Sequence, residues 1–416
     1  MTLLSGGLIK RWRWKGMGIL TGILCLLLIG VRGYQAYQTR NVPAPLASSV
    51  ELYTFHDGKL VAYSAQEGSV RWTHALEDSY TGRLEMQTGD HSIYLSGQTS
   101  TMNIVTAYRA DTGTLLWRTP LVSFASGLLT DQPPLVADGM VYIGIYGQGY
   151  HDHGLLYALR GSSGQIAWKH LVPSYPTSML PKSPLAVGDG LVVALTEDHG
   201  IFAWHAHDGS LAWHSLLNGY QPVCTQQACY LLQDTIISPG TEQAREHFAV
   251  LALRGSSGKL LWQRTIPLQG NASGSGALLA VFGQHLYLGV VAHWLDAMST
   301  LDGTLLWQRA VGLPLGETLL EANGVVYTPD DLSIDALSVH DGTRLWSRDA
   351  DSDSSFGTPL FVHNVLFVAE QPVPLPPRIP HGEGSSILFV LNAGDGSVYW
   401  RLPGGGGVMA ITDTAA

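Results

Sequence analysis

Short apolar runs separated by small turns recur along most of the chain. In LEMQTGDHSIYLSG (84–97), PPLVADGMVYIG (133–144) and SPLAVGDGLVVALT (183–196), two apolar runs flank a turn that contains Asp and Gly or a relative of that pair. Runs of this kind around a short turn are typical of strands and predict a hairpin. A second hairpin follows the first, as in LYALRGSSGQIAW (156–168), so the pattern predicts groups of four strands.

The second hairpin of each group contains a glycine that is followed, four residues later, by a tryptophan. Six residues before the glycine stands an alanine in seven groups, and Val390 in the eighth. The glycine accommodates a positive φ in the turn. We interpret the small residue as one that leaves backbone exposed for the flat indole to lie on. The eight pairs are Gly68/Trp72, Gly113/Trp117, Gly164/Trp168, Gly209/Trp213, Gly258/Trp262, Gly303/Trp307, Gly342/Trp346 and Gly396/Trp400.

The spacing of these pairs predicts an eight-bladed β-propeller. Successive glycines are 39 to 54 residues apart, and a four-stranded unit repeated at this period reads as a propeller blade. The first group has room for only three strands, whereas the run 407–413 after the last tryptophan has no partner. Because ring closure removes unpaired edges, we expect 407–413 to supply the innermost strand of the first blade, within a propeller spanning 50–413.

The repeated unit resembles the tryptophan-docking motif of the PQQ-like eight-bladed β-propeller family. This family contains the quinoprotein dehydrogenases and a non-enzymatic branch that includes the barrel-assembly propeller lipoprotein. The resemblance covers roughly residues 50–413 and all eight motifs. The third motif position is typically Asp in the family, and this sequence departs from it at Ser64, Arg109, Arg160, His205, Arg254, Ser299, Ser338 and Asn392.

The resemblance also defines which chemistry to look for. The family's enzymes hold a quinone beside a vicinal Cys-Cys disulfide, with carboxylate and amide ligands to calcium and an Asp base. This sequence has no Cys-Cys pair, and its acidic run 349–355 reads as a solvated loop rather than a Ca²⁺ site. His205 and His207 alternate along a strand and could bind a metal, but both fit ordinary positions of the motif. We therefore expect no catalytic residue, no metal and no bound PQQ or Ca²⁺.

The N-terminus differs from the rest of the chain. Basic residues between Lys10 and Lys15 precede the apolar run 16–31, which reads either as a cleaved signal peptide or as an uncleaved anchor. We favour an anchor within residues 1–40, with its basic end in the cytoplasm, followed by a linker over 41–49. The expected protein is then a single-pass protein of the cell membrane, with its propeller on the extracytoplasmic side.

Charge and cysteine use agree with an exported domain. Residues 1–40 hold six Lys and Arg and no Asp or Glu, which leaves the remainder with 17 against 33, a net charge of −16. Such a domain is a poor nucleic-acid binder, because phosphate binding needs clustered cations. Cys224 and Cys229 flank a four-residue turn and either form a disulfide or remain two thiols; we predict the disulfide and an oxidising compartment.

Three long connections between the second and third strands of their blades remain for function. They cover 146–154, 233–247 and 370–386, all on the rim that also carries the inter-blade loops. We expect a monomeric protein-interaction scaffold that binds a partner at this rim and is not an enzyme. The alternative is a small-ligand sensor or quinoprotein-type oxidoreductase that uses the central channel.

Overall fold

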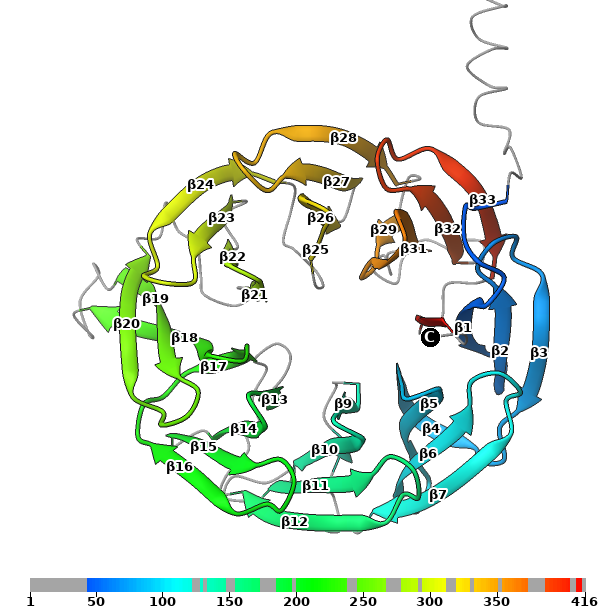
Figure 1. Ribbon diagram of the computed structural model, residues 1–416, viewed down its shortest axis with the longest axis horizontal. Coiled ribbons are helices and arrows are strands. Elements are labelled where there is room, and N and C mark those ends of the chain that lie inside the picture. Colours follow the sequence, from blue (N-terminus) through cyan, green and yellow to red (C-terminus); the bar gives the residue numbers. More distant parts are fainter. Residues whose placement is uncertain are drawn as a thin grey trace, which may run out of the picture.

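Eight antiparallel sheets stand around a common axis in the computed structural model (Figure 1). This architecture confirms the predicted all-β, eight-bladed propeller with four strands per blade. The structure describes residues 43–121, 128–129, 133–146, 154–172, 185–196, 200–237, 245–266, 278–290, 294–311, 319–329, 333–350, 354–372, 386–404 and 409–413. The predicted membrane anchor lies outside these ranges, and no helix within them is long and apolar enough to cross a membrane.

Five blades, numbered 2 and 4 to 7, contain four consecutive strands that run in order from the axis to the outer wall. Blade 2 contains β4 (Tyr80–Gly89), β5 (Ser92–Thr99), β6 (Asn103–Arg109) and β7 (Leu115–Leu121). Blade 4 contains β13 (Leu185–Gly188), β14 (Leu191–Thr196), β15 (Gly200–His205) and β16 (Leu211–Ser215). Blade 5 contains β17 (Tyr220–Cys224), β18 (Ala228–Ile237), β19 (Arg245–Arg254) and β20 (Leu260–Ile266).

Blades 6 and 7 repeat this order. Blade 6 contains β21 (Leu278–Phe282), β22 (His285–Val290), β23 (Trp294–Ser299) and β24 (Leu305–Ala310). Blade 7 contains β25 (Leu320–Ala322), β26 (Val325–Pro329), β27 (Ser333–Ser338) and β28 (Arg344–Asp349).

In blades 3 and 8, two short strands take the innermost place. Blade 3 contains β8 (Leu128–Leu129) and β9 (Leu135–Ala137), both paired with β10 (Met140–Tyr146), and then β11 (Gly154–Arg160) and β12 (Ile166–Val172). Blade 8 contains β29 (Ser354–Phe356) and β30 (Leu360–Val362), both paired with β31 (Val365–Pro372), and then β32 (Ile387–Asn392) and β33 (Val398–Pro403).

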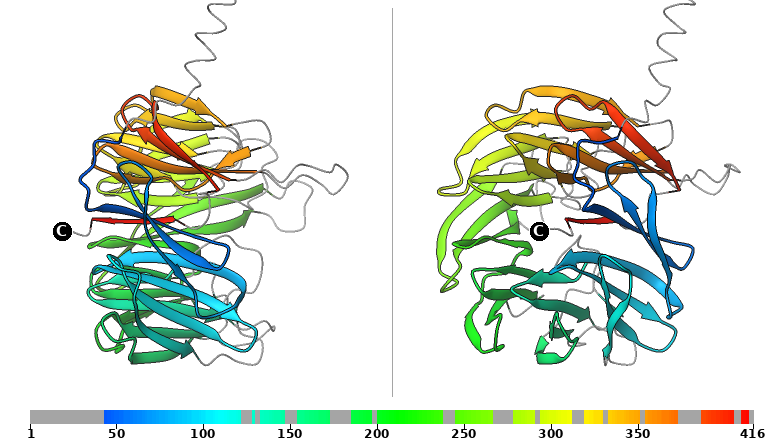
Figure 2. Two further views of the ribbon diagram at one scale, coloured as in Figure 1. Left: turned by 90° about the vertical axis from the view of Figure 1, so that its right-hand side faces the viewer. Right: turned by 45° about the vertical axis from the view of Figure 1, so that its right-hand side comes forward.

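Blade 1 combines both ends of the propeller. It contains β34 (Met409–Asp413), β1 (Val50–His56), β2 (Lys59–Ser64) and β3 (Val70–Ala75), with β34 innermost. The two chain ends pair antiparallel, with Leu52 opposite Ile411, and lie side by side in every view (Figures 1 and 2). The last strand therefore covers an edge of β1 that would otherwise be open.

The outer hairpin of each blade has one shared geometry. A register shift follows the small residue in every blade, as between Ala158 and Leu159. The motif glycines all have φ between 65° and 74°, a conformation that is strained for other residues. The bulge and the turn together orient the outermost strand, so that its tryptophan points out of its own sheet.

The buried core lies between neighbouring blades. One cluster joins Tyr142, Leu156 and Trp168 of blade 3 to Val192 and Trp204 of blade 4, and similar clusters occur at the other joints. Because both faces of a blade are covered by its neighbours, the second and third strands read as continuous apolar runs. Stability consequently depends on the joints between blades.

Candidate functional site: the joints between blades and the rim

The predicted docking tryptophans lie on the outermost strands and reach the next blade around the ring. Seven of them donate the indole Nε1–H to the backbone carbonyl three residues before the next motif glycine, at 2.6 to 3.1 Å. The donor and acceptor pairs are Trp72 to Ala110, Trp117 to Gly161, Trp168 to Ala206, Trp213 to Gly255, Trp262 to Thr300, Trp307 to Val339 and Trp346 to Ala393.

The eighth tryptophan breaks this rule. Trp400 is 3% exposed, and its Nε1 has no hydrogen-bond partner among the described residues. Burial also varies among the eight indoles: Trp72, Trp262 and Trp346 are half-buried, whereas the other five are buried. The motif thus forms the joint between blades, and one joint differs from the other seven in its polar contacts.

Each motif glycine forms a floor for the indole of the preceding blade. A Cβ atom added at Gly342 would lie 2.7 Å from Trp307 Cε3, and one at Gly396 would lie 2.8 Å from Trp346 Cε3. An added Cβ would clash with an indole in the same way at five other glycines: Gly113 with Trp72, Gly164 with Trp117, Gly209 with Trp168, Gly258 with Trp213 and Gly303 with Trp262. Since a Cβ would overlap each of these indoles, only glycine fits at this position.

This packing adds a second surface to the interpretation made from sequence, in which each indole lies on backbone left exposed by the small residue of the paired strand. That residue does pair with its own tryptophan across the sheet, as Ala62 does with Trp72 and Ala252 with Trp262. The indole also packs on glycine backbone of the neighbouring sheet. The interpretation was therefore incomplete, because the Gly and Trp that are four residues apart belong to two different joints.

A tyrosine accompanies the tryptophan in six joints, which the sequence reasoning missed. It pairs with the motif alanine across the sheet, as Tyr142 does with Ala158, and its ring lies about 6 Å from the indole. In four joints its hydroxyl donates to the carbonyl that the indole also uses, as Tyr142 does to Ala206 O at 3.2 Å. The sequence feature that could have predicted these tyrosines is their place in the apolar run that follows the first hairpin turn, as in VVYT (325–328).

These tyrosine hydroxyls keep their protons at physiological pH. Burial raises the pKa of Tyr142 and of Tyr327 to about 12. Because the phenol stays protonated, it remains a hydrogen-bond donor to the neighbouring blade. Six joints therefore carry a second aromatic anchor beside the tryptophan, whereas Val193 and Phe367 stand opposite the small residue in blades 4 and 8.

The third motif position tolerates many side chains because its backbone closes the turn. In every blade its N–H donates to the residue after the glycine, and its carbonyl accepts from the glycine N–H, at 2.8 to 2.9 Å. The Asp before the glycine supports the same turn: backbone and hydroxyl hydrogen bonds from Thr304 lower the pKa of Asp302. The Arg and His at this position are exposed and consistent with a structural turn.

The two cysteines lie at directly paired positions of β17 and β18. Their Cα atoms are 4.1 Å apart and their sulfurs are bonded at 2.10 Å. The bond joins the innermost strand of blade 5 to its neighbour. The two cysteines do not form a haem attachment site, which requires the sequence C-x-x-C-H.

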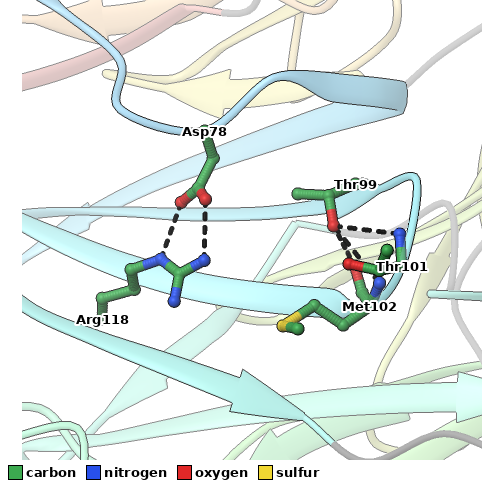
Figure 3. A network of polar contacts seen from close by, with 5 residues as sticks. All are labelled: Asp78, Thr99, Thr101, Met102 and Arg118. Atoms are coloured by element: carbon green, nitrogen blue, oxygen red, sulfur yellow. Dashed lines mark hydrogen bonds and ion pairs between the residues drawn. The ribbon is translucent and has the colours of Figure 1, made fainter.

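The rim carries the inter-blade loops and the connections between second and third strands. In blade 2, Arg118 forms a bidentate ion pair with Asp78 at 2.9 and 2.7 Å, beside the turn from Thr99 to Met102 (Figure 3). This turn is closed by the Thr99 hydroxyl, which bonds to the Met102 carbonyl and backbone N–H. The three predicted rim loops are shorter than expected, because β18 and β19 stay paired as far as Ile237 opposite Arg245 and β31 extends to Pro372. The remaining residues 147–153, 238–244 and 373–385 lie outside the described residues.

The donor groups for a calcium ion or a metal do not converge in the described part of the chain. No group of three His, Cys, Asp or Glu side chains occurs there. Two of the buried carboxylates are engaged singly: Asp296 accepts from Gln308 at 2.8 Å, and Asp335 pairs with Arg344 at 3.4 Å. Residues 349–355 are only partly described.

The fold is shared by solved propellers of different activities. BamB from Moraxella catarrhalis matches with a TM-score of 0.51 at 17% identity, over 78% of this chain and 89% of that one. Quinohemoprotein alcohol dehydrogenase ADHIIG from Pseudomonas putida HK5 matches with a TM-score of 0.54 at 14% identity, over 80% and 69%. At these identities the likeness shows the fold alone.

Sequence comparison, unlike the shared fold, links this chain to BamB. Two curated relatives, both called outer membrane protein assembly factor BamB, are 24% identical: one from Moranella endobia (strain PCIT) over 239 residues, and one from Yersinia pestis over 233 residues. Each match covers 55% of this chain and spans 57% and 56% of the respective relative's length. A family model described as outer membrane protein assembly factor BamB matches residues 56–179, 101–279 and 268–412. The chain therefore belongs to the outer membrane protein assembly factor BamB family of PQQ-like propellers.

Proposed function

We propose that this chain is a non-catalytic scaffold that binds protein partners during outer membrane protein assembly. The observation that carries the proposal is the family match, which extends across the ring from residue 56 to residue 412. The names of the two curated relatives supply the process. Because the matches to those relatives span little more than half of their length, the partners themselves are part of the proposal.

The motif residues hold the blades together, so they are not free to bind a partner or a ligand. The repeated Trp, Gly and Tyr side chains are engaged in joints between blades, where they contact backbone of the next sheet. The buried carboxylates Asp296 and Asp335 are held singly, each by a neighbour in its own blade. A rigid ring with its motif residues engaged in packing leaves its loops for recognition.

We place the partner site at the rim and the propeller outside the cytoplasm. The connections between β10 and β11, β18 and β19, and β31 and β32, which were predicted as loops over 146–154, 233–247 and 370–386, all leave from one rim. The paired Cys224 and Cys229 suit an oxidising compartment. We further propose that residues 1–40 attach a single copy of the chain to a membrane through the apolar run 16–31.

A loop exchange tests the partner site directly. The full chain, with residues 373–385 replaced by Gly and Ser at equal length, is cross-linked in its own host beside the unaltered chain. A second variant replaces residues 147–153 in the same way. We expect a specific cross-linked partner to be lost with at least one exchange, together with reduced outer membrane protein content. Unchanged cross-links and unchanged outer membrane proteins in both variants would contradict the proposal.

Two further measurements separate this proposal from the alternative. Addition of pyrroloquinoline quinone and Ca²⁺ to the purified chain is expected to give neither saturable binding nor dye reduction. Turnover would instead establish an oxidoreductase. For the compartment, a Cys25→Ser variant isolated without reductant is expected to show no free thiol until reduced, since Cys224 and Cys229 are its only other cysteines.

A further inference from the structure

The joint between blades 8 and 1 lacks, among the described residues, the polar contacts that hold most other joints. Trp400 packs on Gly68, where an added Cβ would lie 2.9 Å from Cζ3, but its buried indole N–H has no acceptor in the described ranges. A buried unpaired donor lowers stability relative to a satisfied one. Phe367 occupies the place of the joint tyrosine and has no hydroxyl to donate. This joint therefore depends more than most others on its apolar contacts.

The segment Pro43–Ser49, which we call the strap, lies over this joint. Ala44 is 1% exposed and Leu46 is 6% exposed, whereas Pro43, Pro45 and Ala47 between them face solvent. The two buried side chains join a core cluster made from both blades: Val50, Leu52 and Ala65 of blade 1, and Val365, Phe367, Leu388, Val390 and Trp400 of blade 8. The strap thus fills the apolar interior of the joint from outside.

One backbone hydrogen bond and one side-chain hydrogen bond join the strap to blade 1. The N–H of Ala44 donates to Gln66 O at 2.6 Å, within the motif turn that receives Trp400. Arg71 of the outermost strand donates to Ser48 O at 3.4 Å. Pro43 and Pro45 restrict the unbound conformations of the segment, so that less entropy is lost when it docks.

We propose that the strap is a built-in clamp that closes the ring at the joint between blades 8 and 1, in place of the missing docking hydrogen bonds. The strap connects directly to the N-terminal segment that precedes it. Displacement of the strap therefore opens this joint. The clamp requires no particular partner and is independent of the proposed function.

Hydrogen exchange of the full chain tests the clamp. Leu46→Ser is expected to raise amide exchange at least tenfold in β1, β33 and β34, with the other joints unchanged. The matched control is Leu319→Ser, a leucine that is 3% exposed at the joint between blades 6 and 7. It is expected to raise exchange at its own joint and to leave β34 protected. Exchange of β1 and β34 at wild-type rates in Leu46→Ser would overturn the proposal.

A second pair of variants covers the case in which Leu46→Ser fails to fold. Trp400→Phe removes indole packing but no hydrogen bond to the described part of the chain, because its N–H has no acceptor there. Trp307→Phe removes the same packing and also the 2.6 Å hydrogen bond to Val339 O, so exchange at its joint is expected to rise about fivefold more than exchange at the strap joint does in Trp400→Phe. Equal increases in the two variants would show that the indole, rather than the strap, holds the joint between blades 8 and 1.

Discussion

The joint between blades 6 and 7 and the joint between blades 8 and 1 use the same motif in different ways. At the former, Trp307 packs on Gly342, donates to Val339 O at 2.6 Å and lies 6.0 Å from the ring of Tyr287. At the latter, Trp400 keeps the packing, but neither the acceptor nor the tyrosine is present among the described residues. The difference teaches that the motif supplies shape at every joint, whereas hydrogen bonds are added where the chain is continuous.

The joint between blades 8 and 1 is also the only one of the eight described joints made from distant parts of the sequence. Its blade 1 side is completed by β34 and covered by the strap, so the joint depends on segments that lie about 360 residues apart in the chain. Hydrogen bonds join the strap to blade 1, whereas the contacts that Ala44 and Leu46 of the strap make within the joint are apolar. Such contacts are non-directional and tolerate small displacements of the two chain ends.

Removal of β34 is expected to destabilise the joint between blades 8 and 1 more than any substitution described below. Deletion of residues 404–416 leaves the edge of β1 unpaired and uncovers the buried Leu52 and Tyr53, so we expect a loss on the order of 4–5 kcal/mol in the free energy of unfolding. Deletion of residues 414–416, which follow β34, is the matched control and is expected to be neutral. Urea unfolding followed by tryptophan fluorescence measures both. Coincident unfolding curves would contradict the role of β34.

Removal of a whole indole gives the next largest effect. Trp307→Ala removes a side chain that is 7% exposed, and we expect a loss of about 3–5 kcal/mol. Leu301→Ala, at a side chain that is 85% exposed in the same blade, is expected to change stability by less than about 0.5 kcal/mol. Similar urea midpoints for the two variants would show that Trp307 does not hold its joint.

Substitution of each tryptophan by phenylalanine isolates the contribution of the indole hydrogen bond to stability. Trp307→Phe loses a hydrogen bond, whereas Trp400→Phe loses none to the described residues, so the first variant is expected to lose about 1 kcal/mol more than the second. The difference between two like substitutions removes most of the shared packing effect. Thermal unfolding of both variants at one pH provides the measurement, and a larger loss in Trp400→Phe would reverse the ranking of the joints.

The smallest effect depends on pH and concerns blade 6 itself. Burial raises the pKa of Asp296 above its ordinary value, against the hydrogen bond from Gln308 that lowers it. The folded chain therefore binds a proton more readily than the unfolded chain, and this contribution to stability is lost as pH rises through the folded pKa. Asp296→Asn keeps an amide oxygen for Gln308 and is expected to unfold at higher urea at pH 7. An unchanged pH profile of stability would contradict this assignment.

The sequence predicted the blades well because their signal is local. Glycine, small residue and tryptophan are all within one hairpin, and each has a conformational reason to be there. The tyrosine anchors are separated from their tryptophans by 19 to 32 residues, and the pairing of Tyr142 with Ala158 becomes visible only once the register is known. The strap escaped prediction for a similar reason: PAPLA (43–47) reads as a linker until Ala44 and Leu46 are seen buried against a strand from the far end of the chain.

Ring closure by the last strand has a consequence for the order in which the protein matures. A chain that is synthesised from its N-terminus presents β1 first, yet the partner strand Met409–Asp413 arrives last. Until then β1 is an open edge that can pair with any other extended chain. An interrupted product, lacking only its final residues, would keep that edge permanently and remain a target for aggregation or proteolysis. Pairing of β34 with β1 thus distinguishes a complete ring from a truncated one.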